Sequence, residues 1–469
     1  MDLIREATRL PELEYMFRHV LTQEAAYSTI LHRRRRQFHL RVGEALEALF
    51  PERQAELAPT LARHFVEAGE SGRALKYATL AGDEAFRLHA HTEAIEHYTQ
   101  ALEMARRLPA SEVPTTRLLH LYRRRGRALE HSILFDEAVA NYEAMEALAQ
   151  ERADAALALA SLVARGTLYA TPTPFFNPAQ GRDVTTRALD LARSSGDRTT
   201  EAKILWIIML ANFFQGHIEA ASRYGEEALA LARELDDREQ LGHTLNDLAF
   251  YVYRVKGEIE RSLAAAEEAR GIWRDLGNLP MLADNLVSSA FDYHFYAGEF
   301  QQALAMLAEA RHISESVDNQ WGLAYSSGAL GGIYGEMGEA DKAIPALEEA
   351  LRLAAGGFEA MEAIGSGILA MLYYNLGATD LSIEYGQRAV TWARRRIPFW
   401  LAMTLGTLAL AYIKKGEYDQ AEAAIQEAEQ ARPPGEAYGF DEATEWARCE
   451  LDLLHGEYAR LIERIEAYS

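Results

Sequence analysis

Cysteine is nearly absent from this chain, in which Cys449 is the single thiol among 469 residues. One cysteine excludes an internal disulfide and is typical of a reducing compartment, so we expect a cytoplasmic protein. The N-terminal residues lack the apolar centre of a signal peptide, and no stretch approaches the ~20 uninterrupted apolar residues that span a bilayer. The sequence therefore predicts neither secretion nor a membrane span.

Phosphate-binding glycine loops are also missing. The pattern Gly-x-x-x-x-Gly-Lys-Ser/Thr does not occur, and glycine is nowhere followed by lysine. Without that lysine and the backbone N–H groups of the loop that bind the phosphates, the chain has no site for nucleotide hydrolysis. No Ser-His-Asp, Cys-His or paired-carboxylate arrangement stands out, and His89 and His91 alternate on a predicted helix without facing one metal site. We expect a protein that is not an enzyme and that uses no cofactor or metal.

Positive charge is scarce. The chain has 48 Lys and Arg residues against 70 Asp and Glu, for a net charge of -22. Because the phosphate backbone attracts cationic surfaces, this balance disfavours nucleic acid and anionic membranes as partners. The run Arg33–Arg36 is the exception, and no aromatic residues interleave with it. We favour a solvated helix face, or a contact with another module, over nucleic-acid binding for this run.

A repeated pattern fills most of the sequence. Between Gly328 and Ala350 it reads as helix, tight turn and helix: Gly338 ends the first helix, and Ala343 and Ala350 share one face of the second. The position of Ala343, which we call the small-residue position, recurs at steps of 39 to 43 residues. It holds Ala138, Gly181, Ala221, Ser262, Ala303, Ala343, Ser382, Ala421 and Leu461.

A glycine stands five residues before each of the last seven small-residue positions, namely Gly216, Gly257, Gly298, Gly338, Gly377, Gly416 and Gly456. With Leu330, Gly331 and Tyr334 on the preceding helix, the set resembles the tetratricopeptide (TPR) family, whose usual repeat has about 34 residues. The longer period here implies longer helices or loops. The resemblance predicts an all-α fold, a TPR-like helical-repeat superhelix (α-solenoid).

The first 50 residues do not follow the repeat. We expect two short strands, at Leu3–Ala7 and Leu13–His19, and then helices, the second of which is basic. Residues 10–27 resemble a junction in bacterial STAND-type signalling ATPases, between a nucleotide-binding module with a winged helix and a C-terminal TPR array. Such proteins often carry class III adenylate or guanylate cyclases, or act as transcriptional activators. We expect a C-terminal fragment of such a protein or a degenerate stand-alone relative.

Three regions are expected on this basis. Residues 1–50 form a winged-helix remnant or junction, residues 51–110 form short irregular TPR-like helix pairs, and residues 111–469 form the TPR superhelix. The pattern leaves open two classes of function. One is a non-catalytic sensor that binds a protein, a peptide or a small-molecule effector and regulates an attached or upstream ATPase, cyclase or transcription regulator. The other is a passive scaffold that joins partner proteins.

The TPR resemblance implies that the first helix of each pair lines a concave groove. The residues expected to face a ligand or partner there are Trp206, Phe213, His243, Asn246, Phe250, Tyr253, Phe291, His294, Phe295, Tyr325, Gly328, Gly332, Gly335, Met371, Tyr374 and Met403. Boundaries drawn from sequence can slip, so the register of this set can be off by one.

Two features of the array have alternative interpretations. Gly328, Gly332 and Gly335 form one helical stripe, which serves either the approach of a ligand or tight helix packing. Phe175 and Phe176 follow a proline-rich loop, and either cap a hydrophobic edge or reach for a ligand. A polar outer face is expected on the final helix.

Overall fold

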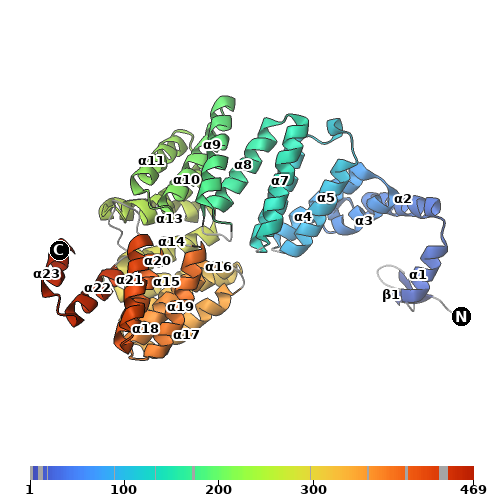
Figure 1. Cartoon of the computed structure of the whole chain (residues 1–469). Coiled ribbons are helices and arrows are strands. Elements are labelled where there is room, and N and C mark those ends of the chain that lie inside the picture. The colour runs from blue at the N-terminus through green and yellow to red at the C-terminus, as the bar shows by residue number, and fades with distance from the viewer. Residues whose placement is uncertain are drawn as a thin grey trace. The chain divides into compact units, whose positions relative to one another are not determined.

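A computed structural model describes residues 4–8, 14–17, 20–88, 90–132, 134–171, 175–295, 297–355, 359–396, 400–431 and 442–468. The chain divides into two compact units, Met1–Ala160 and Ser161–Ser469, which we call unit 1 and unit 2 (Figure 1). His89 and residues 432–441 lie outside the described residues.

Unit 1 begins with an antiparallel hairpin of β1 (Ile4–Thr8) and β2 (Glu14–Phe17), in which Ile4 pairs with Phe17. β2 lies within the expected range, and β1 overlaps its expected range and ends one residue later, at Thr8. The helices that follow are α1 (Val20–Thr29), α2 (His32–Leu49), η1 (Pro51–Arg53), α3 (Ala58–Ala68), α4 (Ser71–Arg87), α5 (His91–Arg106), η2 (Ala110–Glu112), α6 (Thr115–His131) and α7 (Phe135–Arg152). From α2 to α7, each long helix packs on the next one.

Helix α8 (Ala155–Ala170) crosses the boundary between the units. Unit 2 continues with α9 (Pro178–Ser195), α10 (Arg198–Phe213), α11 (Ile218–Glu234), α12 (Arg238–Asp247), η3 (Leu248–Tyr253), α13 (Ile259–Leu276), α14 (Leu279–Ser289), η4 (Ala290–Phe295), α15 (Phe300–Ser316), α16 (Gln320–Glu336), α17 (Ala340–Ala354), α18 (Glu359–Asn375), α19 (Thr379–Arg396), α20 (Leu401–Lys415), α21 (Tyr418–Ala431), α22 (Glu442–Leu454) and α23 (Tyr458–Tyr468). We call α10, α12, α14, α16, α18, α20 and α22 the A helices, and α11, α13, α15, α17, α19, α21 and α23 the B helices.

The turn inside each helix pair is built on the glycine that the sequence predicts. All seven glycines, from Gly216 to Gly456, have φ between +72° and +85°, a left-handed conformation that residues with a Cβ rarely adopt. At Gly338, the backbone N–H of Glu339 reaches back to the carbonyl of Tyr334 at 2.8 Å and closes the helix end. The expected position and role of these glycines are confirmed.

The start of several A helices is fixed by a side-chain cap. Asp197, Asp237, Asn278 and Asn319 each accept a hydrogen bond from the backbone N–H three residues later, at 3.0 to 3.3 Å. Such caps satisfy an amide group that a helix N-terminus leaves unpaired. Together, the cap and the turn glycine set the length of each A helix.

The small-residue positions bring the helices of a pair together. Ala221, Ser262, Ala303, Ala343, Ser382 and Ala421 are fully buried. The two serines also bond across the pair, because Ser262 Oγ donates to the carbonyl of Ala249 and Ser382 Oγ donates to that of Ala370. A larger side chain here would force the two helices apart.

The glycine stripe of α16 faces other helices. A Cβ at Gly328 would lie 2.9 Å from Met361 Sδ of α18, one at Gly332 would lie 3.1 Å from Phe291 Cε2, and one at Gly335 would lie 3.8 Å from Leu372 Cδ1 of α18. These distances favour the packing interpretation of the stripe. For the pair Phe175 and Phe176, one contact bears on the two interpretations. The Phe176 ring meets the Phe214 ring edge-on, with centroids 6.0 Å apart, which favours capping of a hydrophobic edge.

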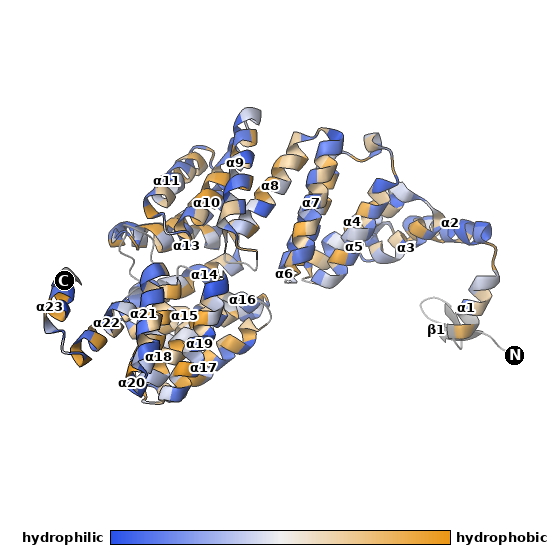
Figure 2. Ribbon diagram, viewed as in Figure 1, coloured by the Kyte–Doolittle hydropathy of each residue, from blue (hydrophilic) through white to orange (hydrophobic). Residues whose placement is uncertain are grey.

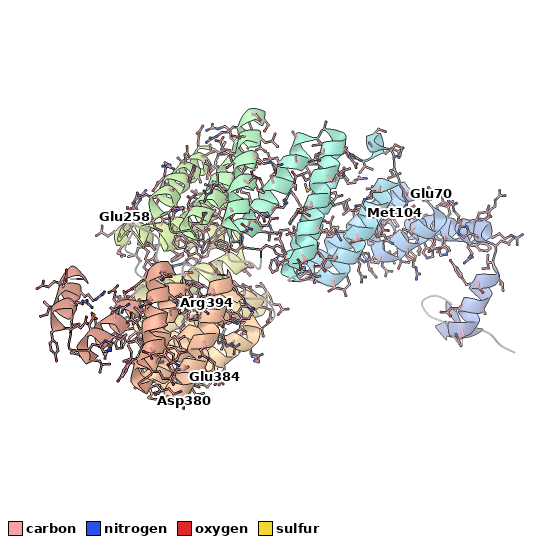
Figure 3. The ribbon with its side chains drawn as sticks, viewed as in Figure 1. Glu70, Met104, Glu258, Asp380, Glu384 and Arg394 are labelled. Carbon is pink, nitrogen blue, oxygen red and sulfur yellow. The ribbon has the colours of Figure 1, made fainter. Side chains whose placement is uncertain are left out.

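Exposed ion pairs connect neighbouring repeats along the surface. Arg233 pairs with Glu268, and Arg394, labelled in Figure 3, pairs with Glu427. Each pair is largely solvated, so its contribution to stability is small. Among the described helices, none is long and apolar enough to cross a membrane.

Candidate ligand-binding groove

Successive A helices lie side by side in unit 2, with contacts between α10 and α12, α14 and α16, α16 and α18, and α18 and α20. Polar side chains connect them across the repeats. Asn285 Nδ2 of α14 donates to Asn246 Oδ1 of α12 at 2.9 Å, and Ser288 of α14 bonds the Tyr325 hydroxyl of α16 at 3.1 Å. Polar contacts that are largely buried therefore join neighbouring A helices, and the partly exposed side chains beside them form the surface described next.

Three aspartates occupy this surface. Asp247 ends α12, where its carboxylate accepts hydrogen bonds from Trp206 Nε1 at 2.7 Å and from Asn246 Nδ2 at 3.2 Å. Asp284 of α14 accepts from Trp321 Nε1 at 3.2 Å. Asp292 in η4 lies 3.5 Å from Arg254 Nε. All three are partly buried, and neutral donors hold two of them in place.

Burial raises the pKa of each carboxyl group. The pKa of Asp247 rises to about 7, with a further contribution from the charge of Asp284. Burial also raises the pKa of Asp284, against the hydrogen bond from Trp321. The pKa of Asp292 rises to about 6, although the Arg254 charge opposes the shift. Withdrawal from water disfavours the charged form of a carboxyl group, and a like charge nearby adds to that effect.

Two tyrosines belong to the same electrostatic site. Burial raises the pKa of both Tyr251 and Tyr325, and the charges of Asp284 and Asp292 raise each of them further. The Tyr325 ring also stacks on Trp321, with centroids 5.5 Å apart. We call the whole set the acid–aromatic cluster, and it consists of Asp247, Asp284, Asp292, Arg254, Trp206, Tyr251, Trp321 and Tyr325.

Two π-helical segments shape the cluster. The first, η3, begins directly after Asp247, and η4, one repeat later, contains Asp292. A π-helical turn holds an extra residue, which rotates the following side chains relative to an α-helix, and such turns are frequent at functional sites. Their occurrence at the same place in two consecutive repeats points to this surface as the candidate site.

The predicted groove residues divide into two sets by burial. Phe213, Asn246, Phe250, Tyr253, Gly328 and Gly332 are buried in the core. The others keep partial solvent access, and these are Trp206, His243, Phe291, His294, Phe295, Tyr325, Gly335, Met371, Tyr374 and Met403. The six buried residues contribute to packing, so the expected groove positions need correction there.

The structure brings some of the accessible residues together. Trp206 and His243 have ring centroids 5.4 Å apart, and Phe291 stacks on Phe295 at 5.0 Å. Tyr374 belongs to a different neighbourhood, where it packs on the α20–α22 core and meets Trp446 edge-on.

Sequence reasoning missed the charged members of the cluster. Along α12 and η3, it expected His243, Asn246, Phe250 and Tyr253, whereas the partly accessible residues are His243, Asp247, Tyr251 and Arg254. From Asp247 on, each accessible residue lies one position after the expected one, and both sets have ordinary helical spacing. The available signal was Asp284, the single acidic residue in the largely apolar α14.

Comparisons with known proteins agree with this architecture. The tetratricopeptide repeat model matches residues 324–356 and 404–434. A Rap protein solved in complex with Competence and Sporulation Factor has a TM-score of 0.54 at 14% identity, over 77% of this chain and 98% of that one. No curated protein sequence matches the chain.

Two further solved structures are similar at lower TM-scores. A Rap conjugation gene regulator of plasmid pLS20, in complex with the Phr* peptide, has a TM-score of 0.47 at 17% identity, over 63% of this chain and 78% of that one. A STAND protein with a tetratricopeptide repeat sensor from Pyrococcus horikoshii has a TM-score of 0.43 at 16% identity, over 80% of this chain and 51% of that one. With the turn glycines and the buried small residues, the repeat-model match and the first Rap structure show an all-α fold of TPR-like helix pairs.

Proposed function

We propose that unit 2 is a non-catalytic sensor and protein-interaction module that binds a peptide or partner protein at the acid–aromatic cluster. We propose further that this binding regulates an attached STAND-type ATPase, a cyclase or a transcription regulator. TPR modules of this kind bind peptides or partners, and the Rap protein noted above was solved in complex with Competence and Sporulation Factor. The attached module is suggested by the resemblance of residues 10–27 to a STAND junction.

One observation carries the binding proposal: of the three partly buried carboxyl groups, Asp292 lies 3.5 Å from a guanidinium group, that of Arg254, whereas neutral donors hold Asp247 and Asp284. A helical core does not need such groups, because burying a charge without an opposite charge costs stability. Acids with raised pKa values that cluster on one surface are typical of functional sites. A cationic ligand would supply the missing positive charge.

The surrounding groups narrow the class of ligand. The rings of Trp206, Tyr251, Trp321 and Tyr325 accompany the carboxylates, and aromatic faces attract organic cations. A guanidinium group can bond carboxylates and stack on rings at the same time. We therefore propose a peptide with an exposed arginine or lysine side chain as the ligand.

The proposal can be tested with short peptide pools that are identical except at one position, fixed as arginine, citrulline or glutamate. Citrulline keeps the shape of arginine and removes its charge. We expect the arginine pool to bind the full chain at least about tenfold more tightly than the citrulline pool in fluorescence anisotropy. Asp247→Asn should remove this preference.

A matched control is Asp275→Asn, because Asp275 is an exposed acid that pairs with Arg238 on the surface at 2.8 Å. It should leave the preference for arginine intact. Equal binding of the arginine and citrulline pools would contradict the proposal. A partner captured equally well by the native chain and by Asp247→Asn would favour the passive scaffold.

The regulatory part needs a separate test. If the coding sequence upstream of Met1 adds a nucleotide-binding module in frame, the ATPase rate of that longer protein should change when the arginine pool is added. An unchanged rate with the pool bound would reject regulation while leaving the binding proposal intact.

A further inference from the structure

The polar contacts beside Asp247 continue away from the A helices into α13, a B helix along which hydrophilic and hydrophobic residues are mixed (Figure 2). Arg270 Nε of α13 donates a hydrogen bond to Asn285 Oδ1 of α14 at 2.9 Å. Asn285 Nδ2 donates to Asn246 Oδ1 at 2.9 Å, and Asn246 Nδ2 donates to Asp247 Oδ1 at 3.2 Å. Both asparagines are buried, whereas the two ends are partly exposed. We call these four residues the amide chain.

The two ends of the amide chain fix the direction of its hydrogen bonds. A guanidinium group only donates, so the side-chain oxygen of Asn285 faces Arg270 and its NH₂ group faces Asn246. The oxygen of Asn246 then accepts, and its NH₂ group is left to donate to the Asp247 carboxylate, which as an anion only accepts. All three bonds point from the positive end to the negative end. Hydrogen bonds aligned in this way polarise and strengthen one another.

Arg270 is held without a direct ion pair. Its Nη2 donates to Ser289 Oγ at 2.7 Å, and among the described residues no carboxylate pairs with its guanidinium group. Arg311 has the same place one repeat later, 41 residues on in α15, and it pairs directly with Glu349 at 3.0 Å. The positive charge of Arg270 is thus linked to a carboxylate only through the two asparagines.

Other titratable groups surround both ends of the amide chain. Those that act on the Arg270 guanidinium group by charge are Arg274, Glu267, Glu309 and Tyr293. Those coupled by charge to the Asp247 carboxyl group are Asp284 and Tyr251. None of these six residues belongs to the amide chain, so substitutions within the chain leave them in place.

We infer that Arg270 is a positioning residue of the acid–aromatic cluster and acts on the Asp247 carboxylate through the two buried asparagines. The inference rests on the proposed function, because it concerns the same site. A direct ion pair would cover the carboxylate and compete with a cationic ligand. A cation that is separated from it by two amide groups favours the charged form of the carboxylate and leaves the exposed part of that group to the ligand. Arg270 therefore keeps the site charged without occupying it.

The indole N–H of Trp206 reports on the carboxyl group directly, because its Nε1 donates to Asp247 Oδ2 at 2.7 Å. The chain has six tryptophans, so the indole region of a ¹⁵N NMR spectrum is sparse, and Trp206→Phe assigns the signal. In the native chain, we expect this signal to titrate with a midpoint near the Asp247 pKa of about 7. Arg270→Gln keeps a hydrogen-bond donor but loses the charge, and it should raise the midpoint by about half a pH unit. Arg270→Lys should restore most of the native value.

Arg125→Gln is the matched control. Arg125 is also partly exposed and also bonds neutral groups, Thr99 Oγ1 at 2.8 Å and Asn141 Oδ1 at 3.0 Å. Its chain of hydrogen bonds ends at a backbone carbonyl, because Asn141 Nδ2 donates to the carbonyl oxygen of Tyr122. This control should leave the Trp206 midpoint unchanged. An unchanged midpoint in Arg270→Gln as well would overturn the inference.

Asn285→Ala separates the hydrogen bonds from the bare charge. It removes the link from Arg270 to Asn246, so Arg270→Gln should shift the midpoint much less in this background than in the native one. Equal shifts in the two backgrounds would show that Arg270 acts across space, and the inference would be wrong. Circular dichroism confirms that each variant is folded, and Asn246→Ala, which breaks the next bond, replaces Asn285→Ala if that variant does not fold.

Binding of the arginine peptide pool supplies a second measurement. Half a pH unit is about a threefold change in a protonation equilibrium, so Arg270→Gln should bind the pool about threefold more weakly than the native chain at pH 6.5 and equally well at pH 8.5. The NMR titration needs no ligand. Failure of every pool to bind would therefore reject the proposed function, whereas arginine-specific binding with an unmoved midpoint in Arg270→Gln would reject the positioning role alone.

Discussion

The two units use the same helical architecture, but two of their partly buried acids, Asp83 in unit 1 and Asp247 in unit 2, lie in different surroundings. In unit 1, the carboxylate of Asp83 accepts hydrogen bonds from His120 Nε2 and from the Tyr98 hydroxyl, both at 2.7 Å. The pKa of Asp83 is lowered, because these bonds and the nearby charges of His120 and Arg124 outweigh the effect of burial. In unit 2, burial prevails and the pKa of Asp247 rises to about 7.

Overall charge follows the same division. Residues 1–160 contain 21 basic and 24 acidic residues, whereas residues 161–469 contain 27 basic and 46 acidic ones. Small residues and turn glycines build the repeats in both units, although the units differ in net charge. The difference therefore shows that the fold and the site depend on separate sets of residues, and the following predictions test that separation.

The largest effect is expected at Asp247, where burial raises the pKa of the carboxyl group. Asp247→Asn should raise the free energy of unfolding at pH 8 by roughly 2–4 kcal/mol, because the native carboxyl must ionise in a site that raises its pKa. Urea denaturation of both proteins at pH 8 and pH 5 measures the change. The gain should shrink at pH 5, where the native carboxyl is already protonated. A loss of stability at pH 8 would contradict the account of this site.

A second prediction concerns the packing of α16. A Cβ at Gly331 would lie 2.3 Å from Leu347 Cγ, so Gly331→Ala should destabilise the protein by about 1–3 kcal/mol. Gly335→Ala is the matched control, because its Cβ would meet only Leu372 Cδ1 at 3.8 Å. Removing a glycine from a helix interior there should stabilise by up to about 1 kcal/mol. Thermal melts that shift in the same direction for both variants would show that the two glycines do not differ as described.

A third prediction concerns Asp83 in unit 1, whose carboxylate accepts hydrogen bonds from His120 and Tyr98. Asp83→Asn should lower the free energy of unfolding by about 1 kcal/mol at neutral pH, since it weakens the bonds from His120 and Tyr98. This is the opposite sign to Asp247→Asn, and denaturant titration of the two variants side by side compares them. An increase in stability on removing the Asp83 charge would remove the distinction between the units.

The smallest effect concerns acid lability. In unit 1, burial lowers the pKa of His39 and His64, and the pKa of Asp83 is lowered too. The unfolded chain therefore binds more protons at these groups than the folded chain does. Their contribution to the stability of the folded state falls as pH falls. The raised pKa of Asp247 and Asp292 has the opposite sign, and their contribution falls as pH rises from about 4 to 7. Hydrogen exchange should therefore show unit 1 losing protection first on mild acidification. Equal loss in both units would argue against this assignment.

The sequence was sufficient for the repeats because their signals are local. A glycine with positive φ, such as Gly338, and a small residue that is fully buried, such as Ala343, each reflect a steric requirement that few residue types meet. The hairpin at Ile4–Thr8 and Glu14–Phe17 was likewise predictable from two short apolar runs around Pro11.

The site was less accessible to sequence reasoning. A regular helical period after His243 is compatible with Asn246 and Phe250 in the groove and equally with Asp247 and Tyr251. The structure buries the first two residues, and the second two retain solvent access. Nothing in the local residue pattern marks the π-helical turn of η3. Trp206 and Asp247, which are 41 positions apart, meet only through packing of neighbouring repeats.

The central claim is that the acid–aromatic cluster binds a cation, and proton release on binding tests it most directly. The pKa values of Asp247 and Asp292 are about 7 and about 6, and a bound arginine side chain would lower both, so binding near pH 6.5 must release protons. Calorimetric titration of the arginine peptide pool in buffers of different ionisation enthalpy measures the number of protons released on binding. We predict a net release that is reduced in Asp247→Asn, whereas binding with no proton release, or with proton uptake, would contradict the account.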